Sequence, residues 1–149
     1  MIKHRLGQGF ASHVYLAVDI ATRRTLALKM YAKSKLTPMY QHQVFREIQI
    51  HARMRHEHIV KLFGAFEDSA AFYLVMEYAP GGDLYTHFKH SGGRYSEACV
   101  VRSILRPFLS ALAYIHSLVR GSTVEGRGVE VTGWGLKGGC RGWAQRWLA

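Results

Sequence analysis

The stretch Leu26-Ala27-Leu28-Lys29 decides the fold, because it is a short apolar strand that ends in a lysine. A glycine-rich segment, residues 7–14, precedes it, and a helix-forming stretch that carries Glu47 follows it. A lysine in a buried strand is costly unless an opposite charge pairs with it. The spacing to Glu47 allows a strand-to-helix loop and two helical turns, so the glutamate can return to Lys29. This order of glycines, lysine and glutamate predicts a site for nucleotide phosphates.

The glycine-rich segment reads Gly7-Gln8-Gly9-Phe10-Ala11-Ser12-His13-Val14. Its glycines suit a backbone that approaches phosphates closely, and Val14 is placed to pack on a flat base. Alone, the pattern fits an ordinary hairpin turn equally well. A dinucleotide-binding fold needs a helix directly after the glycines, whereas a second β-prone run follows here. The pattern therefore favours a hairpin flap over phosphates.

The hydrophobic pattern predicts an α+β fold. Val44, Ile48 and Ala52 recur on one face of a helix over Tyr40–Met54, which lies between the third and fourth of five expected strands. After Pro80-Gly81-Gly82 the chain turns helical. The expected strands, rich in Val, Leu, Phe and Tyr, are Ile2–Leu6, His13–Asp19, Thr25–Tyr31, Lys61–Glu67 and Ala71–Tyr78. They predict a small antiparallel sheet with one packed helix.

Two further helices are expected after the turn. Asp83 is placed as the N-cap of a short helix to about Lys89, and Ser96 as the N-cap of a longer helix to about Leu118. Pro107 should kink the longer helix. Its broad apolar face, which needs a partner surface, comprises Val101, Ile104, Leu105, Phe108, Leu109, Leu112 and Ile115.

Composition narrows the class of protein. The 149 residues are 48% hydrophobic and carry a formal net charge of +10, which invites a nucleic-acid partner. The Lys and Arg residues are scattered rather than striped, so we expect none. No run approaches 18 apolar residues and no signal-peptide pattern is present, so we expect no membrane span. Cys99 and Cys140 form no disulfide framework, which fits an intracellular, cytoplasmic or nuclear location.

The histidines and tryptophans suggest two further sites that we set aside. The pairs His56-x-His58 and His87-x-x-His90 lack acidic or cysteine partners at ligand spacing, so no metal site is predicted. From Val119 onward the chain is rich in glycine and holds every tryptophan, without a helix or strand period. We expect residues 119–149 to be disordered rather than a stacking platform for nucleic acid.

These segments together resemble the eukaryotic protein kinase family, in particular Ser/Thr kinases of the aurora-like and polo-like kind. The resemblance runs from Ile2 to Leu118. It is carried by Leu6–Val14, Leu26–Lys29, Phe45-Arg46-Glu47-Ile48, Arg55–Val60, Tyr73–Tyr78 and Ala111–His116. It implies that residues 1–79 are an ATP-binding small lobe. Residues 80–118 would then be the hinge exit and the first helices of an incomplete large lobe.

The resemblance also implies a nucleotide site. Lys29 would contact the α- and β-phosphates of ATP and form an ion pair with Glu47, and Met76 would be the gatekeeper residue. Glu77 and Ala79 would bind adenine through their backbone groups, while Asp83 would reach the ribose. The implied nucleotide contacts are Leu6, Gly7, Gly9, Val14, Ala27, Lys29, Met76, Glu77, Ala79 and Asp83, with Val14 and Ala27 enclosing the base. Ser12 stands where the family has a third glycine.

The chemistry-bearing part of the family pattern is missing. In the family, a segment like Tyr114–Leu118 is followed by a His-Arg-Asp loop and later by Asp-Phe-Gly, but neither tripeptide occurs in these 149 residues. The catalytic base and the side chains that hold Mg²⁺ are thereby absent. We expect ATP binding without phosphoryl transfer, as in a truncated kinase product. There are two alternatives: a non-catalytic module that competes for kinase regulators, and a basic nucleic-acid binder.

The departure from the family pattern begins at Val119, and every valine codon begins with GT, the usual first two bases of an intron. We therefore interpret residues 119–149 as translated intron or a frameshifted exon.

Overall fold

The computed structural model describes the backbone of residues 1–124 and the side chains of residues 1–118. The chain forms two compact units. Within the described residues, one unit comprises Met1–Met54 and Lys61–Tyr78, and the other comprises Arg55–Val60 and residues 79–124. The structure differs here from the sequence-based prediction, which included Arg55–Val60 in the small lobe, residues 1–79. Residues 125–149, most of the segment predicted to be disordered, lie outside the described residues.

The first unit contains the predicted five-stranded antiparallel sheet. Its strands are β1 (Ile2–Gln8), β2 (Ser12–Val18), β3 (Thr25–Ala32), β4 (Leu62–Glu67) and β5 (Ala71–Glu77), and their spatial order is β1-β2-β3-β5-β4. All four neighbouring pairs are antiparallel. The placement of β5 between β3 and β4 brings the middle of β3 into the centre of the sheet. This strand carries Lys29.

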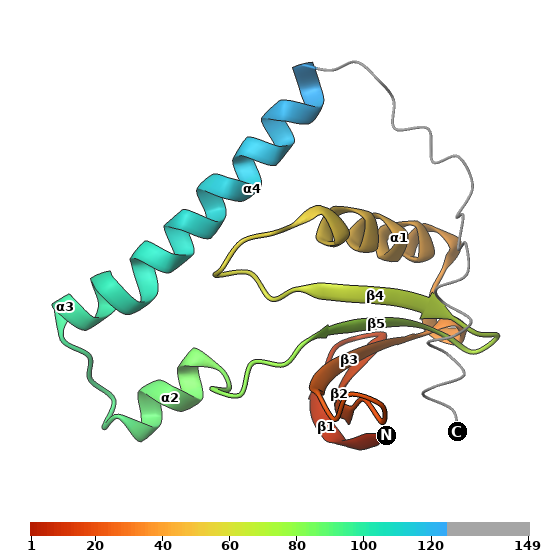
Figure 1. The fold of residues 1–149 in the computed structure, drawn as a ribbon, viewed down its shortest axis with the longest axis horizontal. Helices are drawn as coiled ribbons and strands as arrows, with labels where there is room; N and C mark the ends of the chain where they lie inside the picture. Colours follow the sequence, from red (N-terminus) through yellow and green to blue (C-terminus); the bar gives the residue numbers. More distant parts are fainter. Residues whose placement is uncertain (125–149) are drawn as a thin grey trace. The chain divides into compact units, whose positions relative to one another are not determined.

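Helix α1 (Pro38–Arg53) packs along one face of the sheet, beside β4 and β5 in Figure 1. It begins two residues before the predicted start at Tyr40: the Thr37 side chain accepts a hydrogen bond from the Tyr40 amide, and Pro38 occupies the first turn. A short 3₁₀ turn, Lys33–Lys35, leads into it from β3. The core between helix and sheet consists of Val44, Ile48, Leu62, Phe72 and Leu74. The helix is thereby fixed on the face that holds the candidate site.

A second apolar cluster covers the opposite face of the sheet. It comprises Ala17, Leu26, Leu28 and Val75, with Phe66 and Tyr73 packed against it. Successive residues of a strand point to opposite faces, so β3 buries Leu26 and Leu28 on one side and directs Ala27, Lys29 and Tyr31 to the other. The small sheet is therefore apolar on both faces at its centre.

The second unit is helical. Helix α2 (Leu84–His90) and helix α3 (Glu97–Val100) begin at the predicted N-caps, where Asp83 accepts from the Thr86 amide and Ser96 from the Cys99 amide. The loop Arg55–Val60 belongs to this unit because its backbone and side chains meet helix α4 (Arg106–Val124). The Arg55 amide donates to the Tyr114 hydroxyl at 2.8 Å, and the His56 ring stacks on the Tyr114 ring.

Helices α3 and α4 are joined by a π-helical segment, Val101–Leu105, which ends two residues before Pro107. A proline ring clashes with the backbone carbonyl four residues earlier, and proline has no amide hydrogen to donate to that carbonyl. The wider π turn moves the ring and the carbonyl apart. The disturbance expected at Pro107 therefore takes the form of a π-helical segment. Helix α4 also continues to Val124, past the predicted end at Leu118, because elongation adds one hydrogen bond for each further residue.

By length and composition, the stretch Glu97–Leu118 could cross a membrane, with a mean hydropathy of 1.4. A single helix of this kind is weak evidence, since core helices of soluble proteins meet the same measure. Its apolar residues Leu105, Phe108 and Leu109 are exposed within the described chain. The expectation that this chain has no membrane span stays a prediction.

Candidate nucleotide-binding site

Lys29 and Glu47 form the ion pair that the sequence predicts. The Lys29 Nζ atom lies 2.9 Å from Glu47 Oε1, and the two side chains are 25% and 37% exposed. The lysine comes from the centre of β3, and the glutamate comes from the face of α1 that packs on the sheet beside Ile48. A lysine side chain with a quarter of its surface exposed keeps access to solvent. It can therefore meet an incoming anion without leaving its strand.

The environment favours the charged forms of both partners. Partial burial alone would raise the pKa of Glu47, but hydrogen bonds from Tyr31 and Lys29 outweigh it, so this pKa lies below its ordinary value. Burial alone would lower the pKa of Lys29, but hydrogen bonds with Tyr31 and Glu47 and the charge of Glu47 raise it above its ordinary value. At neutral pH the site therefore holds an ammonium group beside a carboxylate.

The strand register places the expected base-contacting residues on the same face as Lys29. Val14 is the partner of Lys29 across β2 and β3, and Ala27 is the partner of Met76 across β3 and β5. Residues directly opposite in neighbouring strands share a face of the sheet. Val14, Ala27 and Met76 thus lie on the same face of the sheet as Lys29, which is the face that α1 packs on and is called the inner face below. Their contacts with a base stay a prediction.

The glycine-rich loop connects β1 and β2 as a hairpin, as the sequence indicates. The Gly9 amide donates to the Ser12 carbonyl at 2.8 Å, and a Cβ atom at Gly9 would lie 2.9 Å from the Ser12 hydroxyl oxygen. Glycine at this position therefore keeps the turn tight. A Cβ atom at Gly7 would meet nothing within 4 Å. Leu6, in β1, is 42% exposed.

The residues expected at the hinge fall in two units. Glu77 ends β5 in the first unit, where its amide donates to the Lys61 carbonyl at 2.9 Å and its carboxylate accepts from the Lys61 amide. Ala79 and Asp83 belong to the second unit. The Asp83 carboxylate accepts from both the amide and the hydroxyl of Thr86, each at 2.8 Å. These bonds lower the pKa of Asp83, and a ribose would have to share the carboxylate with Thr86.

Tyr31 belongs to this site although sequence reasoning did not single it out. Its hydroxyl donates to Glu47 Oε2 at 2.6 Å. The signal was available, because Tyr31 follows Lys29 by two positions in a strand and must share its face. A pocket of about 220 Å³ opens beside the pair, lined by Phe10, Ala11, Ser12, Tyr31, Leu36, Tyr40, Gln43, Val44 and Glu47.

The described part of the chain contains no cluster of side chains that would enclose Mg²⁺ by itself. No group of three or more His, Cys, Asp or Glu side chains gathers there in a way that could hold a metal ion. Any Mg²⁺ in this unit would depend on ligands other than a cluster of such side chains.

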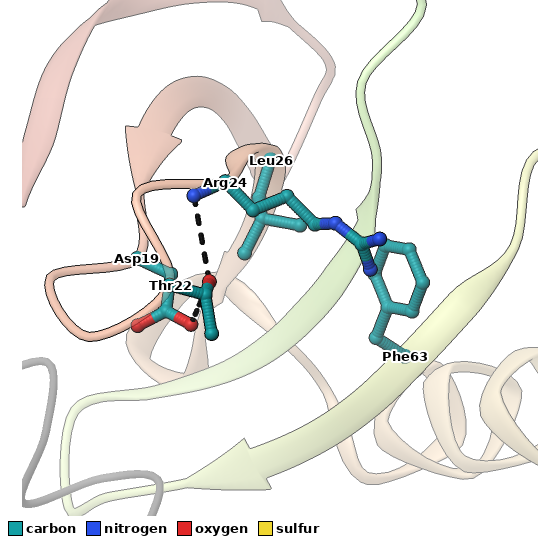
Figure 2. Close-up of a pocket in the computed structure, with 5 residues that line it drawn as sticks. All are labelled: Asp19, Thr22, Arg24, Leu26 and Phe63. Carbon is teal, nitrogen blue, oxygen red and sulfur yellow. Dashed lines mark hydrogen bonds between the residues drawn. The ribbon is translucent and has the colours of Figure 1, made fainter.

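Another pocket, of about 360 Å³, lies at the turn between β2 and β3 (Figure 2). Asp19 closes this turn by accepting from the Thr22 hydroxyl at 2.6 Å, and Arg24 lies over the Phe63 ring. Leu26, which also lines the pocket, is on the opposite face of β3 from Lys29. The pocket is thus separate from the candidate nucleotide site.

A five-stranded antiparallel sheet, one helix packed on it and a strand lysine paired with a helix glutamate define the small lobe of a protein kinase. The chain belongs to the protein kinase domain family, whose model matches residues 1–119.

The relatives include Ser/Thr kinases of two kinds. The chain is 34% identical over 117 residues to the serine/threonine-protein kinase PLK4 of Drosophila ananassae, covering 78% of this chain and 15% of that protein. It is 38% identical over 112 residues to the Aurora kinase of Schizosaccharomyces pombe, covering 74% and 31%. It is 37% identical to Aurora kinase B of Mus musculus over 112 residues, covering 74% and 32%. The chain therefore spans between 15% and 32% of the length of these relatives, and it is a kinase domain fragment related to Ser/Thr kinases.

Proposed function

We propose that this chain binds ATP through its small lobe and does not transfer phosphate by itself. The observation that carries the proposal is the Lys29–Glu47 pair, at 2.9 Å on the inner face of the sheet. Glu47 fixes the position of the Lys29 ammonium group, and a quarter of the lysine side chain is exposed to solvent. A positioned and accessible cation is suited to hold the phosphates of a nucleotide.

The neighbourhood of the pair supports a flat, apolar base beside those phosphates. Val14 and Ala27 are small or branched apolar residues on the same face, and Met76 lies opposite Ala27. Gly7 adds a separate argument. The chain's own packing does not require glycine there, since a Cβ atom would meet nothing within 4 Å. A ligand that lies close to the loop backbone would need the space that a Cβ atom at Gly7 would fill. Such a ligand would therefore explain the glycine.

The second half of the proposal rests on what these 149 residues do not contain. Phosphoryl transfer in kinases uses the aspartate of a His-Arg-Asp loop and Mg²⁺ held by the Asp-Phe-Gly aspartate and a loop asparagine. Neither tripeptide is present. The chain's own residues can hold and orient a nucleotide, but the aspartate that accepts the proton of a substrate hydroxyl in that loop has no counterpart in them. Any role in phosphorylating protein Ser or Thr would need residues outside this sequence.

A glycine pair offers a sharp test. Gly7 and Gly64 are both strand glycines at which a Cβ atom would meet nothing within 4 Å, but Gly64 lies in β4, away from the loop. MgATP affinity is measured by titration calorimetry on the full chain. We expect Gly7→Ala to weaken binding several-fold and Gly64→Ala to leave it unchanged. Equal affinities in both variants, or no binding to the unmodified chain, would contradict the proposal.

A further inference from the structure

The Glu47 carboxylate is held at both of its oxygens by residues of one strand. Lys29 Nζ lies 2.9 Å from Oε1, and the Tyr31 hydroxyl donates to Oε2 at 2.6 Å. Lys29 and Tyr31 are two positions apart in β3, so both side chains point from the same face toward α1. The carboxylate is thus shared between a charged donor and a neutral donor.

The two donors differ in how firmly they are held. Lysine is a point charge on a flexible stem that readily exchanges partners. The Tyr31 ring packs against the buried cluster that contains Phe72 and Leu74, and it lies 4.8 Å from the Lys29 ammonium group. A ring fixed in this way presents its hydroxyl without further ordering. The short hydrogen bond to a carboxylate belongs to the stronger, charge-assisted class.

We propose that Tyr31 is a positioning residue that anchors helix α1 through Glu47 independently of Lys29. Lys29 holds one oxygen of the Glu47 carboxylate and Tyr31 holds the other. The hydroxyl therefore keeps Glu47 on the sheet without drawing on the ammonium group, which can also contact phosphates. The hydrogen bond between Tyr31 and Glu47 is present without nucleotide. Only its role during nucleotide binding rests on the function proposed above.

Charges around the carboxylate agree with this role. The groups that face it are Lys29 and Tyr31 from β3 and His51 from α1, with Tyr40 lining the adjoining pocket. Burial would raise the pKa of Glu47, and the Tyr31 hydrogen bond is the largest of the effects that lower it. Burial and the bond to Glu47 together raise the pKa of Tyr31. The phenol therefore remains a neutral donor to an ionised carboxylate across the neutral range.

The test uses the full chain without nucleotide. Tyr31→Phe keeps the ring, its packing and its position beside the Lys29 ammonium group, and removes the hydroxyl with its hydrogen bonds. Amide hydrogen exchange of α1 is compared in the unmodified, Lys29→Met and Glu47→Ala backgrounds. We expect Tyr31→Phe to speed exchange of the α1 amides about tenfold in the Lys29→Met background and to change it little in the Glu47→Ala background. A similar effect in both backgrounds, or none with Lys29→Met, would overturn the proposal.

A second readout needs only a single conservative variant. The Glu47 side-chain carboxyl is titrated by carbon NMR in the unmodified chain, in Tyr31→Phe and in the control Tyr40→Phe, which removes a hydroxyl from the same pocket. The proposal predicts that only Tyr31→Phe raises the pKa of Glu47. Tyr40→Phe having the same effect, or Tyr31→Phe having none, would count against it. Neither experiment contains ATP, so a failure of nucleotide binding would leave these results intact.

Discussion

Replacing Ile48 by valine tests the packing that positions Glu47. Ile48 is 7% exposed and lies in the cluster between α1 and the sheet, next in sequence to the glutamate. The change removes one methylene group from a packed core, which typically costs about 0.5–1.5 kcal/mol. For a chain of about 150 residues, each kcal/mol shifts the melting temperature by about 2–4 °C. We therefore expect Ile48→Val to lower the melting temperature by about 1–6 °C.

The same helix supplies the matched control. Ile50, two positions further along α1, is 46% exposed. Ile50→Val makes the same chemical change with the same difference in helix propensity, so that term cancels in the comparison. Surface substitutions of this kind usually stay within about 0.5 kcal/mol. Thermal unfolding of the full chain is followed by circular dichroism. Equal shifts for the two variants would refute the packing of α1 described here.

Three further predictions concern pH, chemistry and association. The pKa of Glu47 and the pKa of Asp68 are lowered in the folded state, so the free energy of unfolding should decline as the pH falls below about 4 and through the folded pKa values. Urea titrations across this range should show a smaller decline in Glu47→Gln, and an unchanged decline would contradict the assignment. The purified chain should transfer no labelled phosphate from MgATP to itself or to generic substrates, whereas transfer that depends on Lys29 would show that another base acts. The exposed Leu105 and Phe108 on the last helices are an association liability, so light scattering should detect self-association, and a monodisperse monomer at high concentration would argue against it.

Local patterns predicted the elements of the small lobe well. The recurrence of Val44 and Ile48 marks the buried face of α1, and both residues are buried in the structure, whereas Ala52, the third residue of the predicted face, is exposed near the end of the helix. Lys29 and Glu47 could be paired from the sequence because a lysine in an apolar strand needs an opposite charge. The N-caps Asp83 and Ser96 were visible for a similar reason, since their side chains satisfy amides that a helix leaves unpaired.

Longer-range features did not follow from these patterns. The spatial order β1-β2-β3-β5-β4 depends on pairing between strands far apart in sequence, and their apolar patterns are too similar to select partners. Arg55–Val60 joins the helical unit through the Tyr114 hydroxyl and ring, which no local pattern announces. Tyr31 was overlooked because a tyrosine in a strand is compatible with ordinary core packing. Only the geometry shows its hydroxyl on the Glu47 carboxylate.

The central claim is that Lys29, held by Glu47, binds nucleotide phosphates, and MgATP binding to the Lys29→Ala variant tests it most directly. Titration calorimetry and thermal shift are measured on the full chain, with Lys35→Ala as a matched control on the turn that follows β3. We predict that MgATP raises the melting temperature of the unmodified chain and of Lys35→Ala, and that Lys29→Ala abolishes both the shift and the binding heat. An equal shift in Lys29→Ala would contradict the account.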